Sequence, residues 1–389
     1  KMRGTIIFYL ICLVASTSIA QVVSYTPTLV CNLNDTVSES SGLLYVNQTL
    51  WTHNDSGGKN ELYQIDTITG FIKRKVVIKN ASNYDWEDLA QNTTHVFIGD
   101  FGNNYGNRTN LCVYRINKLD LLNTSLDSIM ADTIKFHYPD QTVFTSTLNA
   151  NNYDCEAFLF YNDSLHLFSK SWIAFNTKHY VVPAIPGNYV AHLVDSFNVS
   201  GLITGADINS ENHVALIGYK KVGFNYNCFA WLLFDYTSSH FFNNNKQRIE
   251  LGVATTLGQT EGIVLKDDNT GYFSSEKINT GLSIVPPQLY KFDFSSFYST
   301  VSIEEVYGDD AFQIYPNPSL DVFTIKFPKI NELSKIEMYN IIGELQLIKT
   351  IDSNSNEISI DGKFSKGVYF IKGISLTDKL LFTKKIIIQ

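Results

Sequence analysis

Charged residues are scarce in this chain of 389 residues: 17% are Asp, Glu, Lys or Arg, and the net charge is −8. No block rich in lysine or arginine occurs, which disfavours a nucleic acid or an anionic membrane as a partner. No long stretch repeats apolar residues with the period of a helix. Beyond residue 20, no apolar run reaches the roughly 20 residues that a membrane span needs. We therefore expect a mature chain without a transmembrane segment and with little helix.

The chain also lacks the spacings of familiar catalytic motifs. Its histidines show no H-E-x-x-H and no other close pair with metal-ligand spacing. The string N-D-S-G-G at 54–58 has the composition of a turn, and no A-A-H-C-like element precedes it to support a serine protease. The loop sequence at 101–108 has neither G-x-G-x-x-G nor the Lys-Ser/Thr of a phosphate loop. No nucleophile-base motif is present, so we expect a non-catalytic protein.

Cysteine usage leaves two interpretations open. Beyond residue 20 the chain has Cys31, Cys112, Cys155 and Cys228, without C-x-x-C spacing, which argues against structural zinc. An even count in an exported protein allows two disulfides in any of three pairings. Cys155 and Cys228 lie in apolar strands, where buried free thiols are as readily expected.

Aromatic residues are abundant at 13%, and a three-part pattern recurs five times. Each repeat opens with an acidic residue before a short apolar strand, and two further strands follow. The acidic positions are 48, 69, 51 and 54 residues apart: Glu39, Glu87, Glu156, Asp207 and Glu261. Repeats of this size with three or four strands predict the blades of a β-propeller. We expect an all-β propeller with five blades, or six if the 69-residue interval hides one, with residues 21–35 supplying the strand that closes the last blade.

The five acidic residues are predicted to converge on the propeller axis, because the first strand of each blade lines the central channel. Clustered carboxylates raise one another's pKa values, and a hard cation such as Ca²⁺ would relieve the repulsion. Asp55, Asp100 and Asn103 could add oxygen ligands. Two alternatives are pairing of the acids, with backbone N–H groups or with lysines, and a catalytic acid-base role. The candidate lysines are Lys170, Lys220 and Lys277.

The repeats carry a family resemblance. The strings E-S-S-G-L with T-H-N-D, W-E-D-L-A with I-G-D-F-G-N-N, and T-E-G-I-V with Y-F-S-S-E are similar to the propellers of the SdiA-regulated and phytase-like esterase families. The resemblance spans residues 38–294. We expect a non-catalytic propeller that binds a ligand and holds Ca²⁺ in its channel, and the resemblance implies one alternative function. That alternative is a Ca²⁺-dependent hydrolase, phytase-like, esterase or lactonase, using the axial acids.

The two ends of the chain predict its destination. Residues 1–20 have a basic start, an apolar centre and small residues before Gln21, the layout of a cleavable signal peptide. At the other end, three short motifs resemble the type A C-terminal sorting domain of the type IX secretion system of the Bacteroidetes. These are Y-P-N-P (Tyr315, Pro316, Asn317, Pro318), G-V-Y (Gly367, Val368, Tyr369) and the pair Lys384, Lys385.

This resemblance implies passage through the periplasm and delivery to the medium or the outer-membrane surface. The implied partners are the type IX secretion machinery and an extracellular ligand. The predicted order is a signal peptide (1–20), a propeller (21–297), an acidic linker (298–311) and the sorting domain (312–389). The alternating strands of the last part predict a small immunoglobulin-like sandwich.

Overall fold

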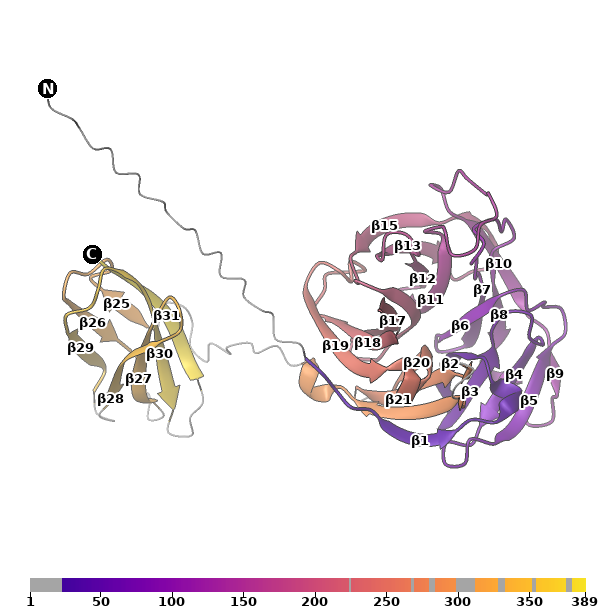
Figure 1. Cartoon of the computed structure of the whole chain (residues 1–389), viewed down its shortest axis with the longest axis horizontal. Helices are drawn as coiled ribbons and strands as arrows, with labels where there is room; N and C mark the ends of the chain where they lie inside the picture. The colour runs from indigo at the N-terminus through magenta and orange to yellow at the C-terminus, as the bar shows by residue number, and fades with distance from the viewer. Residues whose placement is uncertain are drawn as a thin grey trace, which may run out of the picture. The chain divides into compact units, whose positions relative to one another are not determined.

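The computed structural model describes residues 23–223, 225–266, 269–279, 284–298, 312–327, 333–351, 355–375 and 380–389. The predicted signal peptide lies outside these ranges, as does the predicted linker apart from Tyr298. The chain divides into two compact units, residues 1–298 and 299–389, and each is described by itself (Figure 1). Within the described ranges, no helix is long and apolar enough to cross a membrane.

Five sheets of four or five strands build the described part of the first unit. The first sheet holds β2 (Ser40–Val46), β3 (Thr49–Asn54), β4 (Glu61–Ile65), β5 (Ile72–Ile78) and β9 (Ser128–Ile129). The second holds β6 (Trp86–Gln91), β7 (His95–Asp100), β8 (Cys112–Asn117), β10 (Asp132–His137) and β14 (Gly187–Val190). The third holds β11 (Asp154–Tyr161), β12 (Ser164–Lys170), β13 (Thr177–Pro183) and β15 (His192–Phe197).

The fourth sheet holds β16 (Leu202–Ile208), β17 (Val214–Val222), β18 (Asn225–Phe234) and β19 (Asn245–Val253). The fifth holds β20 (Gln259–Leu265), β21 (Thr270–Glu276), β24 (Gln288–Asp293) and β1 (Thr28–Asn32). A small ladder pairs β22 (Ile278–Asn279) with β23 (Ile284–Val285). Helical turns are short: η1 (Asp35–Val37), α1 (Lys118–Leu122), α2 (Ala254–Leu257) and η2 (Ser295–Phe297).

The first strands of the five sheets, β2, β6, β11, β16 and β20, lie side by side at the centre of this unit (Figure 1). Each contacts the next, and β20 contacts β2 again. The approach is close enough to require glycine. A Cβ on Gly42 would lie 2.5 Å from the backbone nitrogen of Leu89, and one on Gly262 would lie 1.9 Å from the carbonyl oxygen of Ser41. The two glycines therefore allow neighbouring inner strands to approach this closely.

Apolar packing follows the same order. Five apolar clusters each join two successive sheets, and the fifth cluster joins the fifth sheet to the first. Trp51 of β3 and Trp86 of β6 are fully buried in the cluster between the first two sheets. Burial of one large apolar side chain contributes about 2 kcal/mol, so these interfaces hold the unit together. The four cysteines of the described part are free thiols.

The N-terminal strand completes the last sheet, as the sequence predicts. Strand β1 pairs with β24, with Thr28 opposite Lys291 and Asn32 opposite Gln288. Two other sheets also take in a distant strand, because β9 adds to β5 and β14 adds to β10, both in parallel. The 69-residue interval is filled in this way by β9, β10 and the loop at 138–153, without a separate sheet in the described part.

The second unit contains two antiparallel sheets around one apolar core. One holds β25 (Gln313–Tyr315), β26 (Val322–Lys326) and β29 (Glu357–Asp361). The other holds β27 (Leu333–Asn340), β28 (Leu345–Thr350), β30 (Gly367–Ser375) and β31 (Leu380–Ile388). Alternate residues of both sheets, including Phe323, Met338 and Ile371, fill the core between them.

The three motifs of the predicted sorting signal come together on β31. Asn317 donates a side-chain hydrogen bond to the carbonyl oxygen of Lys385 at 2.8 Å and accepts the backbone N–H of Ile387 at 3.0 Å. Strand β30 pairs with β31 so that Tyr369 faces Ile386. Motifs up to about 70 residues apart in the chain thus form one local structure.

Candidate metal centre

Every innermost strand carries a register irregularity near its start. In β6, Trp86 pairs with Asp100 and Leu89 pairs with Ile98, so two residues of β6 lie opposite one residue of β7. Strands β2 and β20 show the same irregularity against their partners, and β11 and β16 each insert one residue with none opposite it. Such a bulge re-aims side chains. Its first inserted position is occupied by three carboxylates and two hydroxyls: Ser41, Glu87, Glu156, Thr204 and Glu261.

The structure brings three of the five predicted acids to equivalent places. Glu87, Glu156 and Glu261 are buried, with 2%, 4% and 4% of their surface exposed. The predicted convergence is wrong for Glu39, which is exposed and precedes the bulge position by two residues. It is also wrong for Asp207, which follows the bulge position by three residues and lines a different cavity with Tyr45 and Lys266. The sequence pattern aligns the five repeats on their acidic residues. The sheets instead share a bulge, and in two of them the acidic residue does not lie at the bulge.

Further carboxylates join the cluster from positions that the acidic pattern did not mark. Asp85 and Asp154 stand two residues before Glu87 and Glu156, and alternate residues of a strand share a face. The D-x-E string, present in both strands, is the signal that could have revealed them. Three charged residues at or just beyond the ends of the second strands lie in the same cluster. They are the acids Asp55 and Glu276 and the base Lys170.

The carboxylates form two groups of three that share one member. Oxygen atoms of Asp55, Asp85 and Glu87 lie within 4.8 Å of one another, and so do those of Glu87, Asp154 and Glu156. We call the first group the open triad and the second the closed triad. A cavity of about 300 Å³, here the mouth cavity, is lined by Asp55, Glu156 and other residues of this end of the axis.

The closed triad has its own partners. Asp154 accepts the backbone N–H of Asn103 at 2.5 Å and the indole N–H of Trp172 at 2.7 Å. Glu156 forms an ion pair with Lys170, and both side chains are buried. The predicted pairing of an axial acid with Lys170 is therefore confirmed. Lys220 instead donates to Ser200, and Lys277 pairs with Asp35 on the surface.

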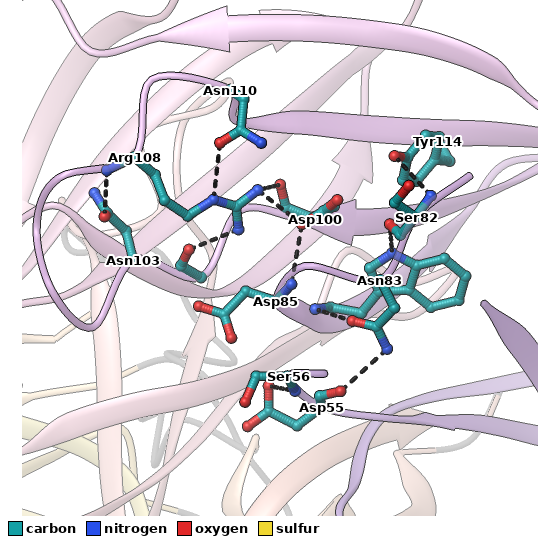
Figure 2. Close-up of polar contacts among 12 residues, drawn as sticks. Asp55, Ser56, Ser82, Asn83, Asp85, Asp100, Asn103, Arg108, Asn110 and Tyr114 are labelled. Atoms are coloured by element: carbon teal, nitrogen blue, oxygen red, sulfur yellow. Dashed lines mark hydrogen bonds and ion pairs between the residues drawn. The ribbon is translucent and has the colours of Figure 1, made fainter. Parts of the chain in front are cut away.

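The open triad has oxygen atoms to spare. The Oε1 atom of Glu87 is buried and has no hydrogen-bond partner among the described residues. Among the described residues, the carboxylate of Asp55 accepts the neighbouring N–H of Ser56 and no other hydrogen bond. Figure 2 shows the Asp85 carboxylate pointing toward Asp55 with no dashed contact. A Cβ on Gly102 would lie 1.8 Å from Glu87 Oε1 and 2.5 Å from the carboxyl carbon of Asp85. The glycine therefore leaves the space in which these carboxylates sit.

Backbone and side-chain contacts fix the open triad in place (Figure 2). The N–H of Asp85 donates to Asp100 at 3.2 Å, and the Asn83 amide donates to the carbonyl oxygen of Asp55 at 3.0 Å. Asp100 is in turn paired with Arg108 at 2.8 Å. Asp100 thus positions Asp85 through its Oδ1 atom. Its Oδ2 atom is buried without a hydrogen-bond partner among the described residues, so its role as a ligand stays a prediction.

Burial, and after it repulsion between the carboxylates, raises the pKa values at this end of the axis. Burial raises the pKa of Glu87 well above its ordinary value, and the charges of Asp55 and Glu156 raise it further. Burial and Asp154 raise the pKa of Asp85 to about 7. Burial raises the pKa of Glu261 to about 8, with help from Glu276. Carboxyl groups so placed stay ionised only if a cation joins them.

The donor set consists of oxygen atoms alone. Hard cations such as Ca²⁺ prefer carboxylate and carbonyl oxygens, and Ca²⁺ accepts irregular geometry with water in some positions. The nearby histidine, His53, is fully buried against the ring of Trp86, and burial lowers its pKa to about 4. The open triad therefore fits Ca²⁺ rather than a metal that requires nitrogen or sulfur ligands.

Comparison with protein families gives a match at the C-terminal end. Residues 313–389 match the family described as "Secretion system C-terminal sorting domain". A curated relative, the endo-acting ulvan lyase of Formosa agariphila, is 26% identical over 129 residues. That segment covers 31% of this chain and 24% of the lyase, so the chain spans about a quarter of this relative.

Solved structures give only distant likeness. PorZ, an essential surface component of the type IX secretion system of Porphyromonas gingivalis, is 13% identical with a TM-score of 0.32, covering 90% of this chain and 45% of PorZ. A quinonprotein alcohol dehydrogenase-like protein of Bacteroides thetaiotaomicron is 11% identical with a TM-score of 0.28, covering 85% and 68%. A mannose phosphorylase of Leishmania mexicana is 11% identical with a TM-score of 0.40, covering 72% and 92%. Such scores carry no argument about activity.

The sorting motifs, the two-sheet unit that joins them and the family match agree with one another. Residues 313–389 are therefore a C-terminal sorting domain of the type IX secretion system, and the protein is exported and is either secreted or held at the cell surface.

Proposed function

We propose that this exported protein is a five-bladed β-propeller that binds Ca²⁺ at the open triad and uses it to bind an extracellular ligand without catalysis. The observation that carries the proposal is the buried Oε1 atom of Glu87, which has no partner among the described residues while Asp55 and Asp85 lie beside it. Five sheets whose inner strands contact one another in a cycle, with β1 completing the fifth, support the blade count.

Pairing within the protein explains only part of the acidic cluster. Lys170 and Trp172 account for Glu156 and Asp154, the two members of the closed triad that do not belong to the open triad. The charges of Arg108 and Lys170 offset part of the rise in the pKa of Asp85. Among the described residues, however, neither forms an ion pair with a member of the open triad, since Arg108 pairs with Asp100 and Lys170 with Glu156. A buried ionised carboxylate without a partner is costly, so a bound cation is the simplest partner for the Oε1 atom of Glu87.

Position favours a ligand-binding role for the ion. Asp55 lines the mouth cavity, which opens to solvent at one end of the axis. Ca²⁺ takes six to eight oxygen ligands, and three side chains leave several positions for water or a ligand. A ligand that enters the cavity can therefore bind the ion directly.

A hydrolase remains the second candidate, and one observation favours it. Glu261 lines the same cavity but belongs to neither triad, so its carboxyl group could act as a base beside a metal-bound substrate. The test is turnover of ester, lactone and phosphate substrates by the full chain, with and without chelator. Chelator-sensitive turnover that is lost in Glu261→Gln would replace the binding proposal with this one.

Thermal unfolding of the full chain tests the Ca²⁺ site. Ca²⁺ at 100 times its dissociation constant should stabilise the folded state by about 2.7 kcal/mol. Glu87→Gln removes a ligand and Gly102→Ala fills the space beside it, so both should lose this stabilisation. Because Gln cannot be repelled by neighbouring charges, Glu87→Gln should melt no lower than the wild type in chelator, which shows that it folds.

The exposed acid Asp127 offers a matched control, and Asp127→Asn should keep the full response to Ca²⁺. If Ca²⁺ does not change the melting temperature of the wild-type protein, the proposal is wrong. It is also wrong if the Glu87→Gln variant responds as the wild type does.

A further inference from the structure

A second cavity lies directly beside the open triad. It has a volume of about 500 Å³, and we call it the side cavity. Asp85, a member of the open triad, forms part of its wall. Asn104 lines both the side cavity and the mouth cavity, so the two adjoin at the acidic end of the axis. A molecule in the side cavity can therefore reach a cation held by Asp85.

The walls of the side cavity combine aromatic rings with neutral polar groups. Tyr84 and Tyr105 are large aromatic residues that remain 62% and 53% exposed. Asparagine amides stand between them, and each can both donate and accept hydrogen bonds. These amides are Asn104, Asn107 and Asn110. Exposed aromatic faces bordered by amides can take the apolar face of a ligand and its polar edge at once.

Charge excludes the common anionic ligands from this cavity. Its one cationic residue is Arg108, whose guanidinium donates to Asp100, to the carbonyl oxygen of Gly102 and to Asn110 at 2.8, 2.8 and 3.1 Å. The ion pair with Asp100 partly offsets its charge, and the contacts drawn in Figure 2 occupy its donors. The carboxylate of Asp85 repels an approaching anion. A continuous apolar wall for a lipid chain is also missing among the residues that line the cavity.

The loop that carries these residues is held in shape before any ligand binds. Asn103 accepts the backbone N–H of Arg108 at 3.0 Å, and its carbonyl oxygen accepts the N–H of Gly106 at 2.8 Å. The neighbouring loop adds a hydrogen bond from the N–H of Thr147 to the carbonyl oxygen of Tyr105 at 3.1 Å. Preorganisation of this kind lowers the entropy lost on binding.

We propose that the side cavity binds a neutral sugar residue of a glycan, which packs against Tyr84 or Tyr105 and offers two ring hydroxyls to the Ca²⁺ of the open triad. The inference rests on the proposed Ca²⁺ site and names its ligand class. A pyranose ring has an apolar face for an aromatic side chain and hydroxyls for the asparagine amides. Hydroxyl oxygens are acceptable ligands for Ca²⁺, and a neutral ring does not meet the repulsion of Asp85.

Calorimetric titration of the full chain with mannotetraose, cellotetraose and laminaritetraose tests the inference. With Ca²⁺, at least one should bind with a dissociation constant of about 1 mM or lower. Chelator should weaken that binding at least tenfold. The double variant Tyr84→Ala/Tyr105→Ala should also bind the glycan at least tenfold more weakly than the wild type does. The melting temperature of this variant should still rise with Ca²⁺. The conservative pair Tyr84→Phe/Tyr105→Phe and the exposed aromatic control Phe71→Ala should bind as the wild type does.

The outcomes separate this inference from the proposed function. If Ca²⁺ stabilises the protein but no neutral tetrasaccharide binds, the glycan inference fails and the Ca²⁺ site stands. Binding of tetragalacturonate in place of the neutral sugars would overturn the argument from charge. Glycan binding that chelator leaves unchanged would overturn the role given to the cation. A wild type that shows no thermal response to Ca²⁺ would defeat the proposed function itself.

Discussion

The Oδ2 atom of Asp88 accepts the backbone N–H of Ala206 at 3.1 Å, although 118 residues separate the two in sequence. The same carboxylate accepts the N–H of Phe158 at 3.1 Å and that of Leu89 at 2.8 Å. Asp88 has no exposed surface. One side chain therefore satisfies backbone donors of the three inner strands β6, β11 and β16, at the irregularity that defines them.

Asp88→Ala should lower the free energy of unfolding by about 3 kcal/mol or more, because an unpaired buried N–H costs about 1–3 kcal/mol. Denaturant unfolding followed by tryptophan fluorescence measures this loss. All four tryptophans lie in the first unit, so the signal reports on that unit alone. The surface control Asp127→Ala should change the value by less than about 0.5 kcal/mol. Equal effects of the two changes would contradict the bridging role.

Lys170→Met should destabilise the first unit by about 3–5 kcal/mol in chelator, since it leaves the buried carboxylate of Glu156 without its partner. The same variant should gain more from Ca²⁺ than the wild type does, because the cation then offsets an additional negative charge. Lys220→Met is the matched control, as Lys220 donates only to the hydroxyl of Ser200. A Lys170→Met protein no less stable than this control would show that the ion pair contributes nothing.

Asp207 should make stability fall with rising pH at the other end of the axis. Burial raises its pKa from 3.8 to about 7, although it accepts the N–H of Leu265 at 2.7 Å. Between about pH 4 and pH 7 the unfolded chain has lost the proton and the native state retains it, so stability decreases across that window. Lys266 lines the same cavity, and the charge of Asp207 raises the pKa of the buried Asp88.

Asp207→Asn should therefore equal the wild type near pH 4 and exceed it at pH 8, by no more than about 4 kcal/mol, since one pKa unit is worth about 1.4 kcal/mol. Urea unfolding across pH 4–8 checks the difference, with Asp127→Asn as the control. Curves for wild type and Asp207→Asn that run parallel would show that this carboxyl group titrates normally.

Deletion of 312–389 should leave the protein in the periplasm of a cell with a type IX secretion system, because the sorting domain is then missing. Immunoblots of periplasmic, surface and culture fractions measure this. Asn317→Ala is a smaller change that should reduce export, since it removes both contacts between Y-P-N-P and β31. Normal export of the deletion variant would mean that another segment carries the signal.

The sequence predicts the sheets better than the site, and the reason is local. Strand and turn composition repeat along the chain, so the five-fold pattern and the closing role of β1 could be read from it. The site depends on a bulge that shifts side chains by one or two residues, which a strand pattern does not reveal. Glu39 and Asp207 look equivalent to Glu87 in the sequence, but Glu39 is exposed and Asp207 lines another cavity. Asp55 joins the cluster from a position that the sequence did suggest, whereas Asp85 joins it from an unmarked one.

The pairing of β1 with β24 has a consequence for maturation. Strand β1 pairs with a strand made some 260 residues later, so this seam is formed only when nearly the whole first unit has been synthesised. Peptide cuts before Thr28 or after Tyr298 remove no residue of the seam. Proteolytic trimming at either end can therefore leave the fifth sheet of the first unit complete.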